Sequence, residues 1–283
     1  VVLIREGKIA RVTSREDLQA EYHGVPVITL SKPLVLMCGL IDAHSHVTQD
    51  VRLPGQPCVA DDSECAHTLI ALKALRDDVE AGITTMRCLG DRYGIDIVLR
   101  DKIAAGEVVG PRLQVAGIGI RSLHDRGHVG QGLSGADEVR RLCRQNLYRT
   151  TEWLKIFVTS TIAPGTGTFV PHYFSREEIA VVAREANACG CMTSAHCIGG
   201  TGLRFCVEEG INVLEHAFWA TREDIELMLR HKTWICFTPG VFLDEDREKN
   251  CKSDYVKRVR AAREQVAERI ATIVKAGVRY VIG

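Results

Sequence analysis

Short apolar segments alternate with amphipathic segments along most of this chain, and this alternation limits the folds open to it. From residue 34 onward we predict eight β-strands, most of them separated by helices. Strands separated by helices run parallel in one sheet, because each helix returns the chain to the same edge. The predicted strands cover residues 34–41, 84–88, 112–116, 153–158, 192–195, 212–214, 234–237 and 280–282.

Several helix ends are marked by capping signals. Ser175 and Glu178 form a capping box, and apolar residues follow at helical spacing. Thr221 opens a second amphipathic helix. A long polar helix is predicted over residues 253–275, and Gly277 ends it.

The number of strands and the length of the chain match an α/β fold, the (β/α)8 TIM barrel, over residues 35–283. A doubly wound sheet is the alternative. Its first strand is more often followed by a glycine-rich phosphate-binding turn. Here the first strand is followed by two histidines instead.

Residues 1–34 are predicted to form part of a separate small β-domain. Apolar strands at 1–4 and 9–12 flank a turn that contains Gly7, which is typical of a hairpin. A further extended segment follows at 25–30.

Composition excludes several partners. The formal net charge is zero and 46% of the 283 residues are hydrophobic, so we expect no nucleic-acid partner. No apolar stretch reaches the roughly 18 residues that span a membrane, so we expect no membrane partner. The eleven cysteines form no Cys-x-x-Cys pair, which favours reduced thiols in a cytoplasmic protein over disulfides or a sulfur metal site.

Metal-type side chains stand at the ends of the predicted strands. His44 and His46 lie two residues apart, so both project to one face of the first strand and can bind one cation. His196 ends the fifth strand and His216 ends the sixth, while Lys155 lies within the fourth. Active sites of (β/α)8 barrels lie at the carboxyl ends of the strands, so we predict that these five residues converge.

Lys155 occupies an apolar strand, where a bare ammonium group is costly to desolvate. Burial lowers a lysine pKa, and the neutral amine can react with carbon dioxide. The resulting carbamate is an anionic oxygen ligand that can bridge two cations. The alternative is a lysine paired with an acid at the barrel mouth.

Four segments together resemble the signatures of the metal-dependent amidohydrolase superfamily. They read LIDAHSH at 40–46, LKI at 154–156, SAH at 194–196 and LEHA at 214–217. The resemblance covers nearly the whole chain and includes the hairpin, which would belong to a small N-terminal β-sandwich domain. Segments at 111–113, 127–128, 163–165 and 174–178 are similar to the prolidase-like dipeptidase branch, which is related to imidazolonepropionases.

The resemblance implies a two-metal site, with zinc as the expected metal. His44 and His46 would bind the more buried ion, His196 and His216 the more exposed one, and carboxylated Lys155 would bridge them. Hydroxide activated by the metals would attack an amide or peptide C–N bond. His128 would contact the substrate, although residues 125–130 depart from the pattern of the branch.

The resemblance also implies an aspartate after the eighth strand, and this sequence stops at Gly283 before it. We therefore expect a fragment, a barrel truncated after strand 8; the alternative is a shortened homologue that binds metal without turnover. The expected substrate is a dipeptide or N-acyl amino acid. A cyclic-amide hydrolase resembling imidazolonepropionase and a homo-oligomeric state are left open.

Overall fold

The structure, a computed structural model, describes residues 1–17, 24, 26–31, 34–49, 63–125, 129–160, 169–249 and 253–283. Within this part of the chain two compact units are distinguished, Val1–Cys38 and Gly39–Gly283. The first unit contains the predicted hairpin, in which β1 (Val2–Arg5) pairs antiparallel with β2 (Lys8–Val12). Gly7 adopts a φ of +72° in the turn, a conformation that favours glycine.

The second unit is an α/β fold whose strands are paired in parallel. Three strands form one sheet in the order β3-β4-β5, and seven form another in the order β12-β11-β10-β9-β8-β6-β7. Their bounds are β3 (Leu40–Ser45), β4 (Ile83–Cys88), β5 (Arg112–Val115), β6 (Ile120–Ser122), β7 (Gln131–Leu133), β8 (Trp153–Phe157), β9 (Met192–Cys197), β10 (Val213–His216), β11 (Trp234–Phe237) and β12 (Tyr280–Ile282).

The strand order differs from that of the doubly wound alternative over most of the unit. From β8 to β12 each strand lies beside the next strand of the sequence, and the same holds from β3 to β5. A doubly wound sheet would reverse its strand order at a switch point. Only β7 departs from this order within the two sheets, because it pairs with β6 on the side away from β8. The paired strands are parallel, so their carboxyl ends share one end of the unit.

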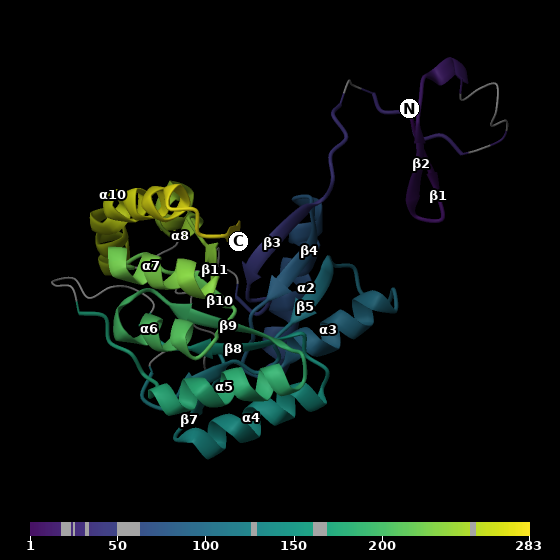
Figure 1. The fold of residues 1–283 in the computed structure, drawn as a ribbon. Helices are drawn as coiled ribbons and strands as arrows, with labels where there is room; N and C mark the ends of the chain where they lie inside the picture. Colours follow the sequence, from purple (N-terminus) through teal and green to yellow (C-terminus); the bar gives the residue numbers. More distant parts are fainter. Residues whose placement is uncertain are drawn as a thin grey trace. The chain divides into compact units, whose positions relative to one another are not determined.

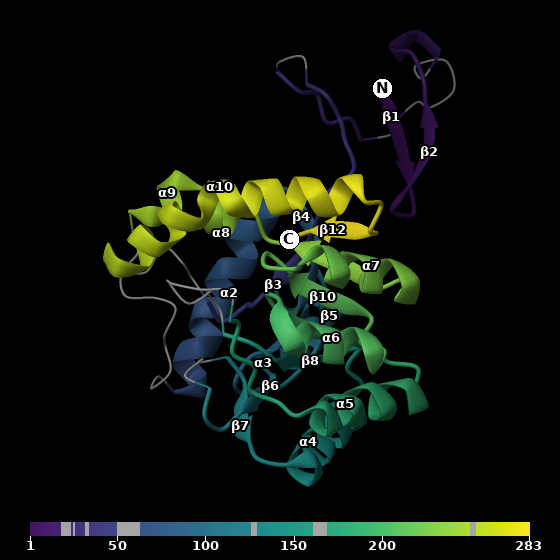
Figure 2. The same cartoon turned by 60° about the vertical axis from the view of Figure 1, so that its left-hand side comes forward.

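Helices follow most of these strands and lie outside them in both views (Figures 1 and 2). The predicted capping box is confirmed, because the Ser175 side chain accepts from the backbone of Glu178 at the start of α5. The helices are α2 (Glu64–Glu80), α3 (Ile95–Ala104), α4 (Ala136–Tyr148), α5 (Arg176–Ala188), α6 (Gly200–Glu208), α7 (Arg222–His231), α8 (Gly240–Leu243), α9 (Glu245–Glu248) and α10 (Ser253–Lys275). No helix among the described residues has both the length and the apolar character needed to cross a lipid bilayer.

The predicted first strand was wrong in its bounds. We expected residues 34–41, whereas β3 covers Leu40–Ser45 and residues 34–39 are neither paired nor buried. Val35, for example, is 92% exposed. A continuous apolar run does not show which of its residues find a partner strand, and pairing with β4 begins only at Leu40 opposite Ile83. This shift places His44 inside the strand and His46 directly after it.

Contacts inside the second unit link its two sheets. Arg87 of β4 donates to Glu215 of β10 through a buried 2.8 Å hydrogen bond. An isolated parallel bridge between Asp91 and Ile118 continues the pairing beyond β4 and β5 toward β6. At the last residue, Gly283, a side chain would collide with the backbone of His44, so the ends of β12 and β3 lie side by side.

Candidate metal centre

The four predicted histidines lie together at the carboxyl ends of their strands. The ring centroid of His44 lies 5.3 Å from that of His46 and 4.9 Å from that of His216. The ring centroids of His196 and His216 are 4.6 Å apart. Imidazoles from positions as far apart as His44 and His216 thus form one cluster, because parallel strands end at the same edge.

Lys155 of β8 lies at the base of this cluster. Its side chain is completely buried, and Nζ lies 5.1 Å from the centroid of the Phe157 ring. The Phe157 ring is in turn stacked against the rings of His46 and His196, each 6.0 Å away between centroids. Residues 155 and 157 point to the same face of β8, so one strand supplies both the amine and the ring that separates the two histidines.

Two histidines donate to backbone carbonyls, which fixes their tautomers. His46 Nδ1 lies 2.8 Å from the carbonyl oxygen of Gly90, and His196 Nε2 lies 3.1 Å from that of Ser160. A carbonyl oxygen only accepts, so each of these ring nitrogens carries the proton. The nitrogens left with lone pairs are Nε2 of His46 and Nδ1 of His196. Those lone pairs are what a metal ion requires.

The other two histidines are held by side chains. His44 Nδ1 lies 2.6 Å from a carboxylate oxygen of Glu215, and His216 Nδ1 lies 2.6 Å from the hydroxyl of Thr238. In both rings it is Nε2 that remains without a protein partner among these contacts. Each of the four imidazoles therefore has one nitrogen anchored and the other available as a ligand.

Burial keeps the four imidazoles neutral. Desolvation, followed by the charge of Lys155, lowers the pKa of His44 to about 4 and that of His196 to about 3. The pKa values of His46 and His216 are also lowered, with burial again the largest cause. Metal ions bind the neutral form of imidazole, so at neutral pH the cluster is in the protonation state that a cation requires.

The same pKa shifts predict an acid-sensitive metal-free protein. Between pH 6.5 and about 3 the unfolded state binds a proton at His196 that the folded state excludes, so stability rises with pH across this window. Acidification from pH 6.5 to pH 4.5 should therefore lower the free energy of unfolding, by on the order of 2 kcal/mol from this residue. Urea unfolding of the wild-type protein and of His196→Gln, each at pH 6.5 and pH 4.5 with a chelator present, measures this change in the free energy of unfolding. Equal pH dependence in both proteins would contradict the expectation.

The backbone is strained at the end of β10, where His216 lies. His216 and Ala217 have φ values of +83° and +49°, a region that non-glycine residues avoid. Such a conformation costs about 1–3 kcal/mol for each residue and persists only when its surroundings hold it. The amide of Ala217 donates to the carbonyl of Cys197 at the end of β9, which helps to hold the turn. These two positive φ angles turn the chain away from the strand direction directly after His216.

The buried amine of Lys155 shows whether this cluster suits a metal ion. Among the described residues Nζ has no hydrogen-bond partner. Burial lowers the pKa of Lys155 to about 8, although the charge of nearby Glu215 opposes this shift. The acid pairing that we considered as an alternative is absent from the contacts of Nζ. An unpartnered buried amine costs stability unless another group binds it. Four available imidazole nitrogens around such an amine are a donor set that suits divalent metal ions.

The second unit matches a known protein family. The sequence profile described as the amidohydrolase family matches residues 35–283, which include every strand and helix of the second unit. The chain belongs to the amidohydrolase family. Members of this family generally use divalent metal ions.

Individual relatives of this amidohydrolase are more distant. An ochratoxinase of Aspergillus niger is 25% identical over 312 residues, and the match covers the whole of this chain but 64% of the relative. The crystal structure of that species' ochratoxinase superposes with a TM-score of 0.72 at 22% identity, covering 87% of this chain and 62% of the other. A Xaa-Pro dipeptidase with bound methionine gives a TM-score of 0.71 at 21% identity, covering 87% and 65%. The structural likeness shows a shared fold.

Sequence reasoning missed the group beneath the histidines of this amidohydrolase. Glu215 is completely buried and accepts hydrogen bonds from His44, Arg87 and Ser194. The ligand atoms of His44, Glu215 and Cys236 lie within 4.8 Å of one another. This trio is a hydrogen-bonded network and not a cation site, because Glu215 already serves three donors and one of them is the Arg87 cation. The detectable signal was a buried-strand carboxylate directly before the predicted ligand His216.

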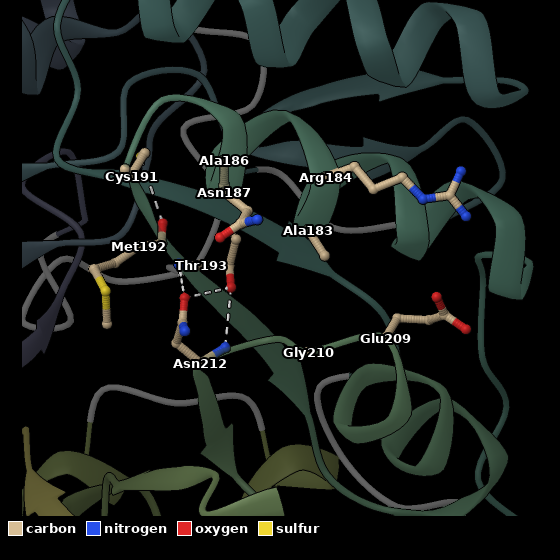
Figure 3. Close-up of a pocket in the computed structure, with 11 residues that line it drawn as sticks. Ala183, Arg184, Ala186, Asn187, Cys191, Met192, Thr193, Glu209, Gly210 and Asn212 are labelled. Atoms are coloured by element: carbon tan, nitrogen blue, oxygen red, sulfur yellow. Dashed lines mark hydrogen bonds between the residues drawn. The ribbon is translucent and has the colours of Figure 1, made fainter.

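The predicted substrate contact, His128, lies outside the described residues, so its role stays a prediction. A pocket of about 440 Å³ lies at the other end of the strands, beside the first residues of β9 (Figure 3). There Asn212 accepts from the backbone and the hydroxyl of Thr193, so these polar groups satisfy each other. The pocket contains none of the predicted site residues, and we assign no function to it.

Proposed function

We propose that this amidohydrolase cleaves amide or peptide C–N bonds of small molecules, most specifically dipeptides or N-acyl amino acids. The observation that supports the proposal is the convergence of four neutral imidazoles, each with one ring nitrogen unengaged, around an unpartnered buried amine. The similar Xaa-Pro dipeptidase and the ochratoxinase suggest the substrate class.

The proposed site holds two divalent ions, with zinc as the expected metal. His44 and His46 would hold one ion through Nε2, while His196 through Nδ1 and His216 through Nε2 would hold the other. Lys155, once carboxylated by carbon dioxide, would supply oxygen ligands to both. When bound, the ions would lower the pKa of water and polarise the substrate carbonyl. The four histidine rings are oriented by hydrogen bonds with Gly90, Ser160, Thr238 and Glu215. Burial excludes bulk water from the cluster.

For the architecture we propose a closed (β/α)8 barrel. Its strands are β3, β4, the consecutive segments β5 and β6, and then β8 to β12. The contact between Gly283 and His44 supports closure, and so does the Arg87–Glu215 bond across the interior. We further propose that the β1–β2 hairpin belongs to a small β-sandwich domain. The chain spans 64% of the length of the curated ochratoxinase. The activity of the whole protein is therefore proposed here and does not follow from that similarity.

Metal content tests the site directly. We expect about two zinc ions for each chain after equilibration with zinc, and we expect His44→Ala to lose at least one of them because one ion then has a single histidine ligand. Elemental analysis of the desalted protein measures this. His231→Ala is the matched control, because His231 is exposed at the end of α7. Unchanged zinc in His44→Ala would reject the site.

Substrate profiling tests the reaction. The zinc-loaded protein is assayed against N-acyl amino acids, dipeptides including Xaa-Pro, and cyclic amides. Release of free amino acid from the first two groups supports the proposal. Turnover of cyclic amides alone would favour the imidazolonepropionase-like alternative, and zinc binding without turnover would favour a catalytically silent homologue.

A further inference from the structure

We propose that Glu215 is a positioning residue that keeps the proton of the His44 ring on Nδ1 and so leaves Nε2 as the metal-binding atom. The inference rests on the proposed function, because it assumes that His44 is a ligand. Its basis is the 2.6 Å contact between His44 Nδ1 and Glu215 Oε2 inside the unit. A carboxylate that binds a ligating imidazole in this way fixes both its tautomer and its orientation.

The carboxylate is itself held in place. Its second oxygen, Oε1, accepts from Arg87 Nη2 at 2.8 Å and from Ser194 Oγ at 2.6 Å. Because these donors come from β4 and β9, while Glu215 is on β10, three strands fix the direction in which Oε2 points. The side chain cannot rotate without breaking three charge-assisted hydrogen bonds.

Arg87 also ties this network to the strand that carries the ligand. Its Nε donates to the carbonyl of Ala43 at 2.6 Å, directly before His44. The guanidinium lies over the Trp153 ring, 4.6 Å from its centroid, which further limits its movement. Arg87 therefore fixes the backbone next to His44, while Glu215, which Arg87 also binds, fixes the His44 ring.

An amide at position 215 would reverse the tautomer. Arg87 can only donate, so the amide oxygen of Glu215→Gln would face Arg87 and Ser194. The amide nitrogen would then face His44 Nδ1, which can accept this hydrogen bond only if its proton moves to Nε2. The His44 nitrogen directed toward the cluster would lose its lone pair, so zinc binding should weaken by roughly 10- to 100-fold.

The tautomer can be read in the metal-free full chain by nitrogen-15 NMR of labelled histidine at neutral pH with a chelator present. The His44 signals are assigned by their absence in His44→Gln. We expect wild-type His44 to carry its proton on Nδ1 and the Glu215→Gln variant to carry it on Nε2. Zinc titration of the same proteins measures the expected 10- to 100-fold loss of affinity.

Ser194→Ala is the matched comparison. It removes one hydrogen bond to Glu215 but keeps the carboxylate opposite His44, so we expect the Nδ1 tautomer to remain. A merely structural role for Glu215 would not distinguish the two variants by tautomer. If both variants showed the same His44 tautomer, Glu215 would not be the residue that sets it.

Two further outcomes would overturn the proposal. One is a wild-type His44 ring with its proton on Nε2, a result that decides the question even if Glu215→Gln does not fold. The other is a folded Glu215→Gln variant that binds zinc as tightly as wild type. Failure of the wild-type chain to bind zinc would instead reject the proposed function, while the tautomer measurement would still decide the role of Glu215.

Discussion

Replacing Arg87 by methionine should lower the free energy of unfolding by about 3–5 kcal/mol, because it removes the cation that is hydrogen-bonded to the buried carboxylate of Glu215. The pair is almost fully enclosed, with 7% of the arginine side chain and none of the glutamate side chain exposed. Burial alone would raise the pKa of Glu215, but Arg87 and His44 hold it well below its usual range. For a unit of this size the melting temperature should fall by roughly 10 °C. Thermal and urea unfolding of the metal-free protein measure both changes.

Two comparisons show whether the lost ion pair is the cause. Arg144→Met removes an arginine that binds Glu185 with two hydrogen bonds at the surface, and we expect a much smaller effect because solvent screens that pair. The double variant Arg87→Met with Glu215→Met removes both charges and should be more stable than Arg87→Met alone. If it is less stable, the cost does not come from an unpaired carboxylate.

Replacing Lys155 by methionine should have opposite effects on stability and on metal binding. Methionine fills a similar volume without a buried, unpartnered amine, so the metal-free protein should become more stable by about 1–3 kcal/mol. The same change removes the proposed bridge between the two ions, and hydrolysis should fall by roughly 1000-fold or more. Urea unfolding, zinc analysis and the amide assay measure the three quantities.

Lys73→Met provides the control, because that lysine is exposed on α2 and pairs with Asp77 one turn away. It should leave zinc content unchanged. A Lys155→Met protein that binds two zinc ions with wild-type affinity would exclude the bridging role. A metal-free Lys155→Met protein that is less stable than wild type would show that the amine has a stabilising partner.

Local patterns predicted most of the second unit. The seven predicted strands that follow the first lie within two residues of their expected bounds, and the capping residues Ser175 and Thr221 start helices as expected. The short strands β6 and β7 were not predicted. These signals are reliable because apolar spacing and capping act over a few neighbouring residues. The first strand was misplaced because its partner is distant in sequence, Leu40 pairing with Ile83, and an apolar run alone does not reveal that pairing.

The sequence by itself determined which elements form and which metal-type residues stand at strand ends, because strand periodicity and the parallel order follow from local pattern. Only the tertiary structure decided which ring nitrogen of each histidine is engaged, since Gly90, Ser160, Thr238 and Glu215 come from distant positions. It alone placed Arg87 against Glu215, 128 residues away along the chain, and left Lys155 Nζ unpartnered. Hydrogen-bond partners in a buried cluster depend on how the strands meet, and no local pattern in the chain encodes that arrangement.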